Sequence, residues 1–296
     1  MEHFADRLTA AIKAKNAPVC VGLDPLIERL PKPFNRIAPI KDFEQYGSAV
    51  IEAVADLVPA IKINIAFFEP YGPSVVETYR QLTAIARQKG LLVIGDVKRA
   101  DIGHTSAQYA KATLEGDSFE VADAATVNPY FGWDGVGPFV EAAQKNSRGV
   151  FVLVQTSNES ASQVQGLTLQ NGQTVCQHVA TLVQEWAAAS GRIGNSGYSC
   201  VGAVVSPRDL ESTIKIRSLM PNCIFLVPGF GAQGRTADEV AKCFKPDGSG
   251  AIVAASRSVI FAYDEPKYKD RKDDWKGCIR DACINFVQSV NLVTRP

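Results

Sequence analysis

Residues 91–105 read LLVIGDVKRADIGHT, and this stretch combines the two features that decide the fold. Leu91 to Asp96 is a short apolar run, typical of a strand that is buried on both faces of a parallel sheet. Three charged residues, Asp96, Lys98 and Asp101, stand where the run ends and the chain turns into the next helix. The stretch therefore predicts a buried strand that carries charged side chains at one end.

The same succession of an apolar run and an amphipathic segment recurs along the whole chain. The runs are short and rich in β-branched residues, and the segments between them repeat apolar residues at helical spacings of three and four. The eight expected strands are Pro18–Asp24, Ile61–Ile65, Leu91–Asp96, Ala124–Asn128, Val150–Thr156, Tyr198–Val205, Ile224–Val227 and Ala251–Ala254. Eight buried strands that each lead into a helix predict an α/β fold, the (β/α)8 or TIM barrel.

The length and composition fit one such barrel. The chain has 296 residues, of which 46% are hydrophobic and 21% charged, as in an ordinary globular protein. A doubly wound sheet is the alternative, but the residues after the first strand lack the glycine-rich fingerprint of that fold. We expect one domain over residues 1–296, with an N-terminal helix, a C-terminal helix and a lid-like loop at 157–173.

Charge and cysteine usage exclude several classes of function. The chain carries 31 basic and 31 acidic residues, so no net charge draws it to nucleic acid or to an anionic membrane. Seven scattered cysteines without a CxxC pair indicate reduced thiols in a cytoplasmic protein, and no segment is apolar and long enough to cross a bilayer. The three histidines lack metal-site spacing, so we expect no metal site built on them.

Polar residues that end the expected strands are the candidates for chemistry, because a barrel holds its site at the carboxyl ends of the strands. Besides Asp96, Lys98 and Asp101, they include Asp24 and Lys62. A structural ion-pair network is the alternative, but desolvating four charges is costly and function is the usual reason for it. Asn128 and Thr156 end strands too, and hydrogen bonds to neighbouring loops explain them equally well.

A phosphate site is expected after the seventh and eighth strands. The sequence there reads PGFGAQG over residues 228–234, and Ser256-Arg257-Ser258 follows the eighth strand. Glycines let backbone N–H groups approach an anion, and an arginine adds a bidentate charged contact. These two loops are the usual phosphate site of a (β/α)8 barrel.

The decad DVKRADIGHT, from Asp96 to Thr105, resembles the DxKxxDIxxT signature of the orotidine 5′-phosphate decarboxylase family. The first-strand aspartate, the second-strand lysine, the glycine-rich loop and the final arginine also occur in the family's order, from about Pro18 to Ala262. The long loops resemble the longer bacterial branch. The resemblance implies a cofactor-independent carboxy-lyase (EC 4.1.1.23) of de novo pyrimidine synthesis, which turns orotidine 5′-monophosphate into uridine 5′-monophosphate.

The resemblance also assigns a role to each matching residue. It implies that Asp24 and Lys62 contact the ribose, that Lys62, Asp96, Lys98 and Asp101 form the catalytic array, and that the active unit is a homodimer with shared active sites. It further implies that Ser157 contacts the pyrimidine, that Gln233 bridges the base and the phosphate, and that Arg257 holds the phosphate. The remaining substrate contacts that it implies are Thr105, Gly231 and Ser256.

Two other functions stay open at this point. A magnesium-dependent sugar-phosphate decarboxylase or aldolase of the same superfamily shares the DxKxxD pattern. Such enzymes have a glutamate on the second strand that binds the metal, whereas this chain has Lys62 on that strand. A catalytically silent phosphate-binding barrel is the second alternative, and the complete charged array argues against it.

Overall fold

Eight parallel strands close into a barrel in a computed structural model that describes residues 2–34, 36–116, 120–229 and 237–294. The strands pair in chain order, and β1 also pairs with β8. Their bounds are β1 Val19–Leu23, β2 Ala60–Asn64, β3 Leu92–Arg99, β4 Ala124–Val127, β5 Gly149–Gln155, β6 Val201–Val205, β7 Phe225–Pro228 and β8 Ala251–Ala255. The predicted (β/α)8 barrel is confirmed.

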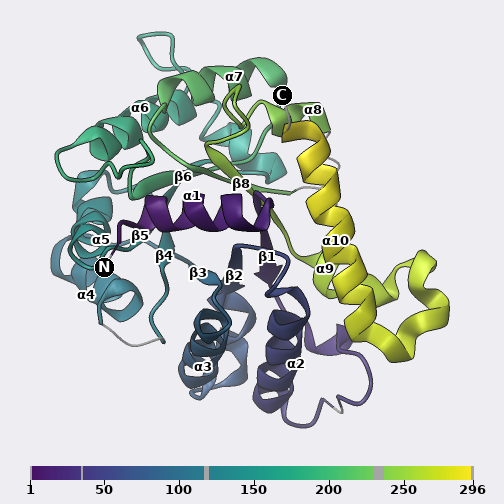
Figure 1. The fold of residues 1–296 in the computed structure, drawn as a ribbon. Helices are drawn as coiled ribbons and strands as arrows, with labels where there is room; N and C mark the ends of the chain where they lie inside the picture. The colour runs from purple at the N-terminus through teal and green to yellow at the C-terminus, as the bar shows by residue number, and fades with distance from the viewer. Residues whose placement is uncertain (1, 35, 117–119, 230–236, 295–296) are drawn as a thin grey trace.

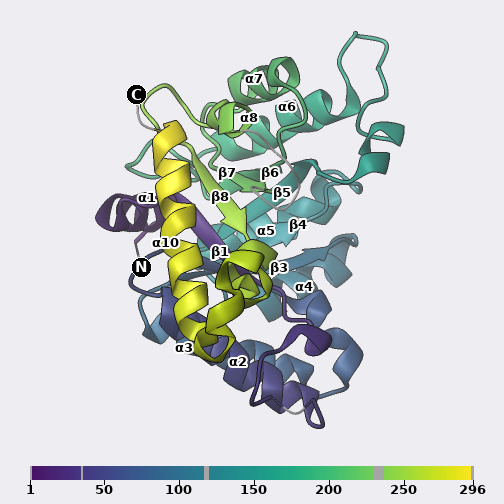
Figure 2. The same cartoon turned by 90° about the vertical axis from the view of Figure 1, so that its right-hand side faces the viewer.

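Helices surround this barrel (Figure 1). Their bounds are α1 Phe4–Lys15, α2 Pro39–Val54, α3 Val75–Gln88, α4 Gly103–Leu114, α5 Trp133–Lys145, α6 Val175–Ala188, α7 Leu210–Leu219, α8 Ala237–Ala241, α9 Arg257–Ile260 and α10 Trp275–Thr294. Short 3-10 turns lie at Ile27–Arg29, Ile65–Phe67, Glu69–Tyr71, Glu159–Gln163, Ala262–Asp264 and Pro266–Asp274. The long helix α10 runs along the outside of the barrel (Figure 2).

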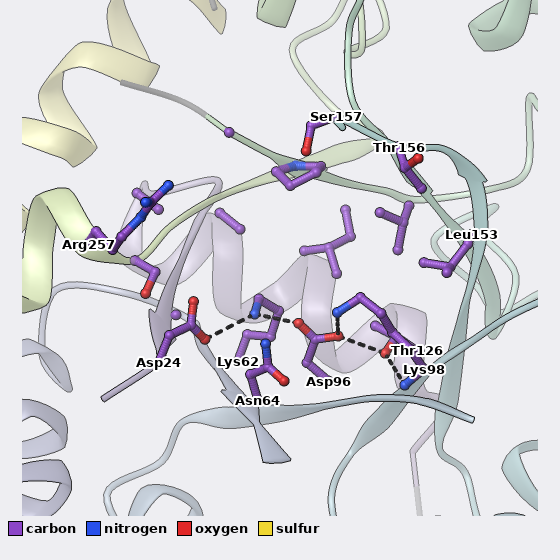
Figure 3. Close-up of a pocket in the computed structure, with 18 residues that line it drawn as sticks. Asp24, Lys62, Asn64, Asp96, Lys98, Thr126, Leu153, Thr156, Ser157 and Arg257 are labelled. Carbon is purple, nitrogen blue, oxygen red and sulfur yellow. Dashed lines mark hydrogen bonds and ion pairs between the residues drawn. The ribbon is translucent and has the colours of Figure 1, made fainter. Parts of the chain in front are cut away.

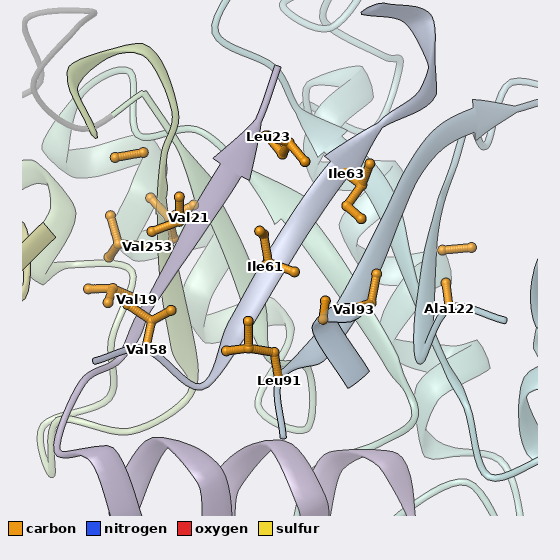
Figure 4. Close-up of a cluster of buried hydrophobic side chains, with 14 of the residues drawn as sticks. Val19, Val21, Leu23, Val58, Ile61, Ile63, Leu91, Val93, Ala122 and Val253 are labelled. Carbon is orange, nitrogen blue, oxygen red and sulfur yellow. The ribbon is translucent and has the colours of Figure 1, made fainter. Parts of the chain in front are cut away.

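The larger core lies between the strands and the outer helices. Alternate side chains of each strand point outward, so that Val21, Ile61 and Val93 from three neighbouring strands form one apolar surface (Figure 4). The helices cover this surface with their own apolar stripes, for example with the buried Phe43 of α2. Both faces of each strand are therefore buried, which explains why the strand sequences are apolar almost throughout.

A second, smaller core fills the inside of the barrel, and α1 lies across one end of it, in front of the strands in Figure 1. Phe4 of α1 packs edge-on against Phe151 of β5, with ring centroids 6.0 Å apart. A Cβ atom at Gly149 would lie only 2.2 Å from the Phe4 ring, so the helix fits there because this residue is a glycine. The polar cavity is thereby confined to the opposite end, where the strands finish.

Most strand ends lie within one residue of the expected position, and the largest differences occur in β3 and β6. β3 continues three residues further, to Arg99, and β6 begins three residues later, at Val201. Segment 157–173 contains the 3-10 turn Glu159–Gln163, and its Thr168 forms an antiparallel bridge with Thr174 just beyond it. Across the described ranges, no helix is both long and apolar enough to span a membrane.

Candidate active site

A cavity of about 260 Å³ opens at the carboxyl ends of the strands (Figure 3). Its floor is apolar and is formed by side chains such as Leu153, Val204 and Leu226. Charged and polar groups stand around this floor. The lining residues with polar side chains are Asp24, Lys62, Asn64, Asp96, Lys98, Thr126, Thr156, Ser157, Ser256 and Arg257.

Four charged side chains form a continuous row along one side of the cavity (Figure 3). The Lys62 ammonium donates to Asp96 Oδ2 at 2.6 Å and lies 3.6 Å from Asp24 Oδ1. Lys98 Nζ lies 2.5 Å from the other carboxylate oxygen of Asp96. Asp96 therefore stands between two ammonium groups, and the signs of the charges alternate along the row.

Strand register explains why residues far apart in sequence meet here. β1 and β2 are paired with Gly22 opposite Lys62, and β2 and β3 with Asn64 opposite Asp96. Side chains at alternate positions share one face of a strand, so Lys62 and Asp96 both point into the barrel. The expectation that the strand-end charges meet in one interior is confirmed for Asp24, Lys62, Asp96 and Lys98.

Mutual attraction keeps the buried members of the row ionised. Burial by itself raises the pKa of Asp96, but Lys62 and Lys98 outweigh it and lower this pKa to about 2. Burial likewise lowers the pKa of Lys62, and the attraction of Asp24 and Asp96 overcomes this and raises it above its ordinary value. At neutral pH the row carries a fixed carboxylate between two cations.

Two polar atoms at the cavity lack hydrogen-bond partners among the described residues. Asp24 Oδ1 and Ser256 Oγ are both buried and unsatisfied. Arg257, next in the chain, is exposed and has no acidic partner in the described ranges. A purely structural network would satisfy its buried atoms. The unsatisfied groups favour a ligand that accepts and donates hydrogen bonds here.

The expected phosphate loop is described only at its beginning. Gly229 lines the cavity and adopts a φ of +93°, a conformation that favours glycine. Gly231 and Gln233 lie outside the described residues. The described side of the expected phosphate site therefore consists of Gly229, Ser256 and Arg257.

Asp101 and Thr105 do not line the cavity of their own chain. Asp101 precedes α4, and its carboxylate accepts a hydrogen bond from the N–H of Ile102 at 2.8 Å. Thr105 is exposed on the first turn of α4. The row within one chain thus ends at Lys98.

Thr156 and Ser157 follow the end of β5, and a glutamine in the next segment holds Thr156. The side chain of Gln165 accepts from the Thr156 N–H at 3.0 Å and donates to Thr156 Oγ1 at 2.7 Å. Asn128 does not line the cavity. Its side chain accepts a hydrogen bond from the N–H of Tyr130 in the following loop, which agrees with the expected role in a loop hydrogen bond.

Sequence reasoning missed two residues whose polar side chains line the cavity, Asn64 and Thr126. Asn64 lies two positions after Lys62 and so on the same face of β2, a signal that the alternation of a strand provides. Thr126 lies inside an apolar run, where nothing distinguishes it from an ordinary strand residue. In the described ranges, no three histidine, cysteine or acidic residues are grouped as a metal site would require.

A closed (β/α)8 barrel with a charged cavity at the carboxyl ends of its strands is the architecture of a barrel enzyme. The sequence model of the orotidine 5′-phosphate decarboxylase / HUMPS family matches residues 17–270. The chain belongs to the orotidine 5′-phosphate decarboxylase family.

Similar proteins match the chain over almost its whole length. It is 41% identical to orotidine 5′-phosphate decarboxylase of Rhodopirellula baltica, over 97% of this chain and 98% of the relative. It is 36% identical to the Clostridium acetobutylicum protein of that name, over 95% and 96% of the two chains. A crystal structure of a putative orotidine 5′-phosphate decarboxylase from Streptomyces avermitilis superimposes with a TM-score of 0.81 at 30% identity, covering 99% of this chain and 96% of that one.

Proposed function

We propose that this chain converts orotidine 5′-monophosphate into uridine 5′-monophosphate and carbon dioxide, the last step of de novo pyrimidine biosynthesis. One observation carries the proposal. Asp96 bridges Lys62 and Lys98 at the edge of a cavity with an apolar floor. The chain that carries this arrangement is 41% identical to orotidine 5′-phosphate decarboxylase of Rhodopirellula baltica.

The row of charges can stabilise the negative charge that develops on the substrate in this reaction. The bond between C6 of the pyrimidine and the carboxyl carbon breaks, carbon dioxide leaves, and the electron pair stays on C6. This pair lies in the plane of the ring and cannot delocalise into the π system. The Lys98 ammonium stabilises the developing charge and then donates a proton to C6. The resulting amine regains its proton from solvent, so no oxidant or reductant is consumed.

The neighbours of Lys98 prepare this step. Asp96, ionised because its pKa is about 2, holds the Lys98 ammonium in place and is itself held by Lys62. A charge pattern fixed before the substrate arrives costs no reorganisation during the reaction. The unsatisfied Asp24 Oδ1 is an acceptor for a ribose hydroxyl.

The phosphate group would lie at the other side of the cavity. Ser256 Oγ is an unsatisfied donor, and Arg257 supplies a cation that has no acidic partner in the described ranges. The apolar floor accommodates the base between the two sides, with Ser157 at its edge. We place Gly231 and Gln233 in the same phosphate site on the family resemblance alone.

The active unit that we propose is a homodimer in which Asp101 and Thr105 complete the partner's site. Neither residue lines the cavity of its own chain. The surface around α4 exposes apolar side chains, including Tyr130 at 81%, Ile102 at 54% and Phe131 at 47%. Neighbouring exposed apolar side chains are typical of a protein interface.

Subunit exchange tests the shared site. Lys98→Ala and Asp101→Ala homodimers are each expected to be inactive. In a mixed dimer, one site carries both changes, and the other combines an intact Lys98 with an intact Asp101 from the other chain. Activity should return toward half the wild-type value per mixed dimer. If mass spectrometry confirms exchange and no activity returns, Asp101 acts within its own chain.

Segment 157–173 is proposed as a lid, because its first residue, Ser157, lines the cavity together with Thr156. Phosphate binding far from C6 would help to drive its closure.

We also propose a cytoplasmic location, which the seven free and buried cysteines support.

The decisive experiment follows the loss of orotidine 5′-monophosphate by ultraviolet absorbance, with and without EDTA. We expect turnover that EDTA leaves unchanged. Turnover that EDTA abolishes would favour the magnesium-dependent alternative, and correctly folded protein without turnover would favour the silent phosphate-binding barrel.

A further inference from the structure

The side chain of Thr126 in β4 hydrogen-bonds to both Asp96 and Lys98. Its hydroxyl donates to Asp96 Oδ1 at 2.9 Å and accepts from the backbone N–H of Lys98 at 3.0 Å. The side chain lines the cavity and is 1% exposed. One hydroxyl thus connects the carboxylate of one array residue with the backbone of another.

The pairing of β3 with β4 explains why a side chain is needed at this point. Gly95 lies opposite Ala125 and Arg99 lies opposite Val127, so three residues of β3 face the single residue Thr126. Such a bulge interrupts the ladder of backbone hydrogen bonds. The N–H of Lys98, which a regular strand would pair with a backbone carbonyl, is satisfied by the Thr126 hydroxyl instead.

The bulge also gives Lys98 an uncommon backbone conformation. Its φ is +42°, in the left-handed region that residues other than glycine rarely adopt. Such a conformation persists only when surrounding contacts hold it, and it is found most often at functional sites. The hydrogen bond from the Lys98 N–H to Thr126 is one such contact.

We infer that Thr126 is a positioning residue, which fixes the Lys98 backbone and the Asp96 carboxylate so that the Lys98 ammonium meets the reacting carbon. The inference rests on the proposed decarboxylation. It assigns no substrate contact to Thr126, since both of its hydrogen bonds already go to the array.

The first test removes the hydroxyl while keeping the β-branched shape. Thr126→Val is expected to lower kcat by about 10- to 100-fold, the scale on which a misplacement of about 1 Å acts. KM should change by less than about threefold, because ground-state binding does not use this hydroxyl. Thr126→Ser keeps the hydroxyl and should retain most of kcat.

A matched control separates positioning from general damage to the core. Thr83 is also fully buried, and among the described residues its hydroxyl bonds only to the carbonyl of Tyr79 within α3. Thr83→Val removes the same atoms far from the cavity and should leave kcat unchanged. If Thr126→Val does not fold, Thr126→Ala is compared with Thr126→Ser, since these two variants differ only in the hydroxyl.

A second measurement does not depend on turnover. Hydrogen exchange at the Lys98 amide should speed up by about tenfold or more in Thr126→Val, because its acceptor is lost, and should be unchanged in Thr83→Val. This separates failure of the inference from failure of the proposed reaction, which the wild-type assay reports.

Three results would overturn the inference. Wild-type kcat in Thr126→Val would show that the hydroxyl positions nothing. A raised KM at unchanged kcat would make it a substrate contact, and an equal loss in Thr126→Ser would mean that packing of the methyl group is what matters.

Discussion

The barrel contains two buried aspartates with several cationic partners, and they lie at opposite ends of neighbouring strands. Asp123, directly before β4, contacts Arg7 and Arg148 at 2.8 Å and Arg87 at 3.3 Å, and is 1% exposed. Asp96, near the end of β3, contacts two lysines. In charge and burial, the two carboxylates look alike.

What surrounds the two carboxylates distinguishes them. The partners of Asp123 line no part of the cavity, and one of them, Arg7, comes from the helix that closes the barrel. Around Asp96, the Lys98 side chain is 48% exposed and the neighbouring Asp24 keeps an unsatisfied oxygen. Within the described ranges, Arg148 Nε in the Asp123 cluster also lacks a hydrogen-bond partner, but Arg148 does not line this cavity. A buried ion cluster thus indicates a reaction site when its unused binding capacity faces a cavity, and a structural junction when it does not.

Lys98→Ala is the sharpest test of this distinction. We expect kcat to fall by at least about 10⁴-fold, since proton donation and charge stabilisation each contribute factors of 10² or more. The fold should survive, because the side chain is half exposed. The checks are the absorbance assay and a thermal unfolding curve. Near-normal turnover would remove Lys98 as the proton donor.

Asp123→Asn should have the opposite effects, a loss of stability with unchanged turnover. Removing the charge leaves three arginines without their shared carboxylate, and breaking a buried pair costs about 3–5 kcal/mol of unfolding free energy. Turnover per folded molecule should stay normal, because none of this cluster reaches the cavity. Urea unfolding and active-site titration measure the two effects. Lost turnover in fully folded protein would contradict the comparison.

Arg257→Ala tests the phosphate side of the cavity. Loss of one charged contact should raise KM by a factor that corresponds to roughly 1.5–3 kcal/mol. The phosphate-free nucleoside serves as the control, and its turnover should hardly change. An equal loss with this nucleoside would show that Arg257 acts on something other than phosphate.

The stabilising effect of Asp96 should fade in acid. Its pKa is about 2 in the folded protein against an ordinary 3.8, so the ionised form stabilises the fold above about pH 4. The advantage of wild type over Asp96→Asn should shrink by about 2 kcal/mol as the pH falls from 5 to 2. The unfolding free energies of both proteins are measured across this range. If the difference between wild type and Asp96→Asn does not change with pH, ionisation of Asp96 does not stabilise the fold.

Much of this site follows from local sequence patterns. The apolar runs predict the strands, and alternation within them predicts that Asp96 and Lys98 reach the same cavity. These inferences succeed because each depends on a few consecutive residues.

The rest depends on contacts between strands. Thr126 matters because the register shift places it opposite three residues of β3, and no pattern within β4 reports that shift. Gln165 is similar, because its role depends on how segment 157–173 folds back onto Thr156. Sequence therefore identifies the charged groups more readily than the neutral residues that orient them.

The closure of the barrel by α1 has a consequence for synthesis of the chain. His3 bonds to the carbonyl of Arg192, and Asp6 accepts from the N–H of Asn195, both across 189 positions of sequence. At translation rates of about 5–20 residues per second, the first helix waits roughly 10–40 s for these partners. During that interval Phe4 and Leu8 have no core to enter, so the nascent chain offers its earliest apolar surface to chaperones before the barrel can enclose it.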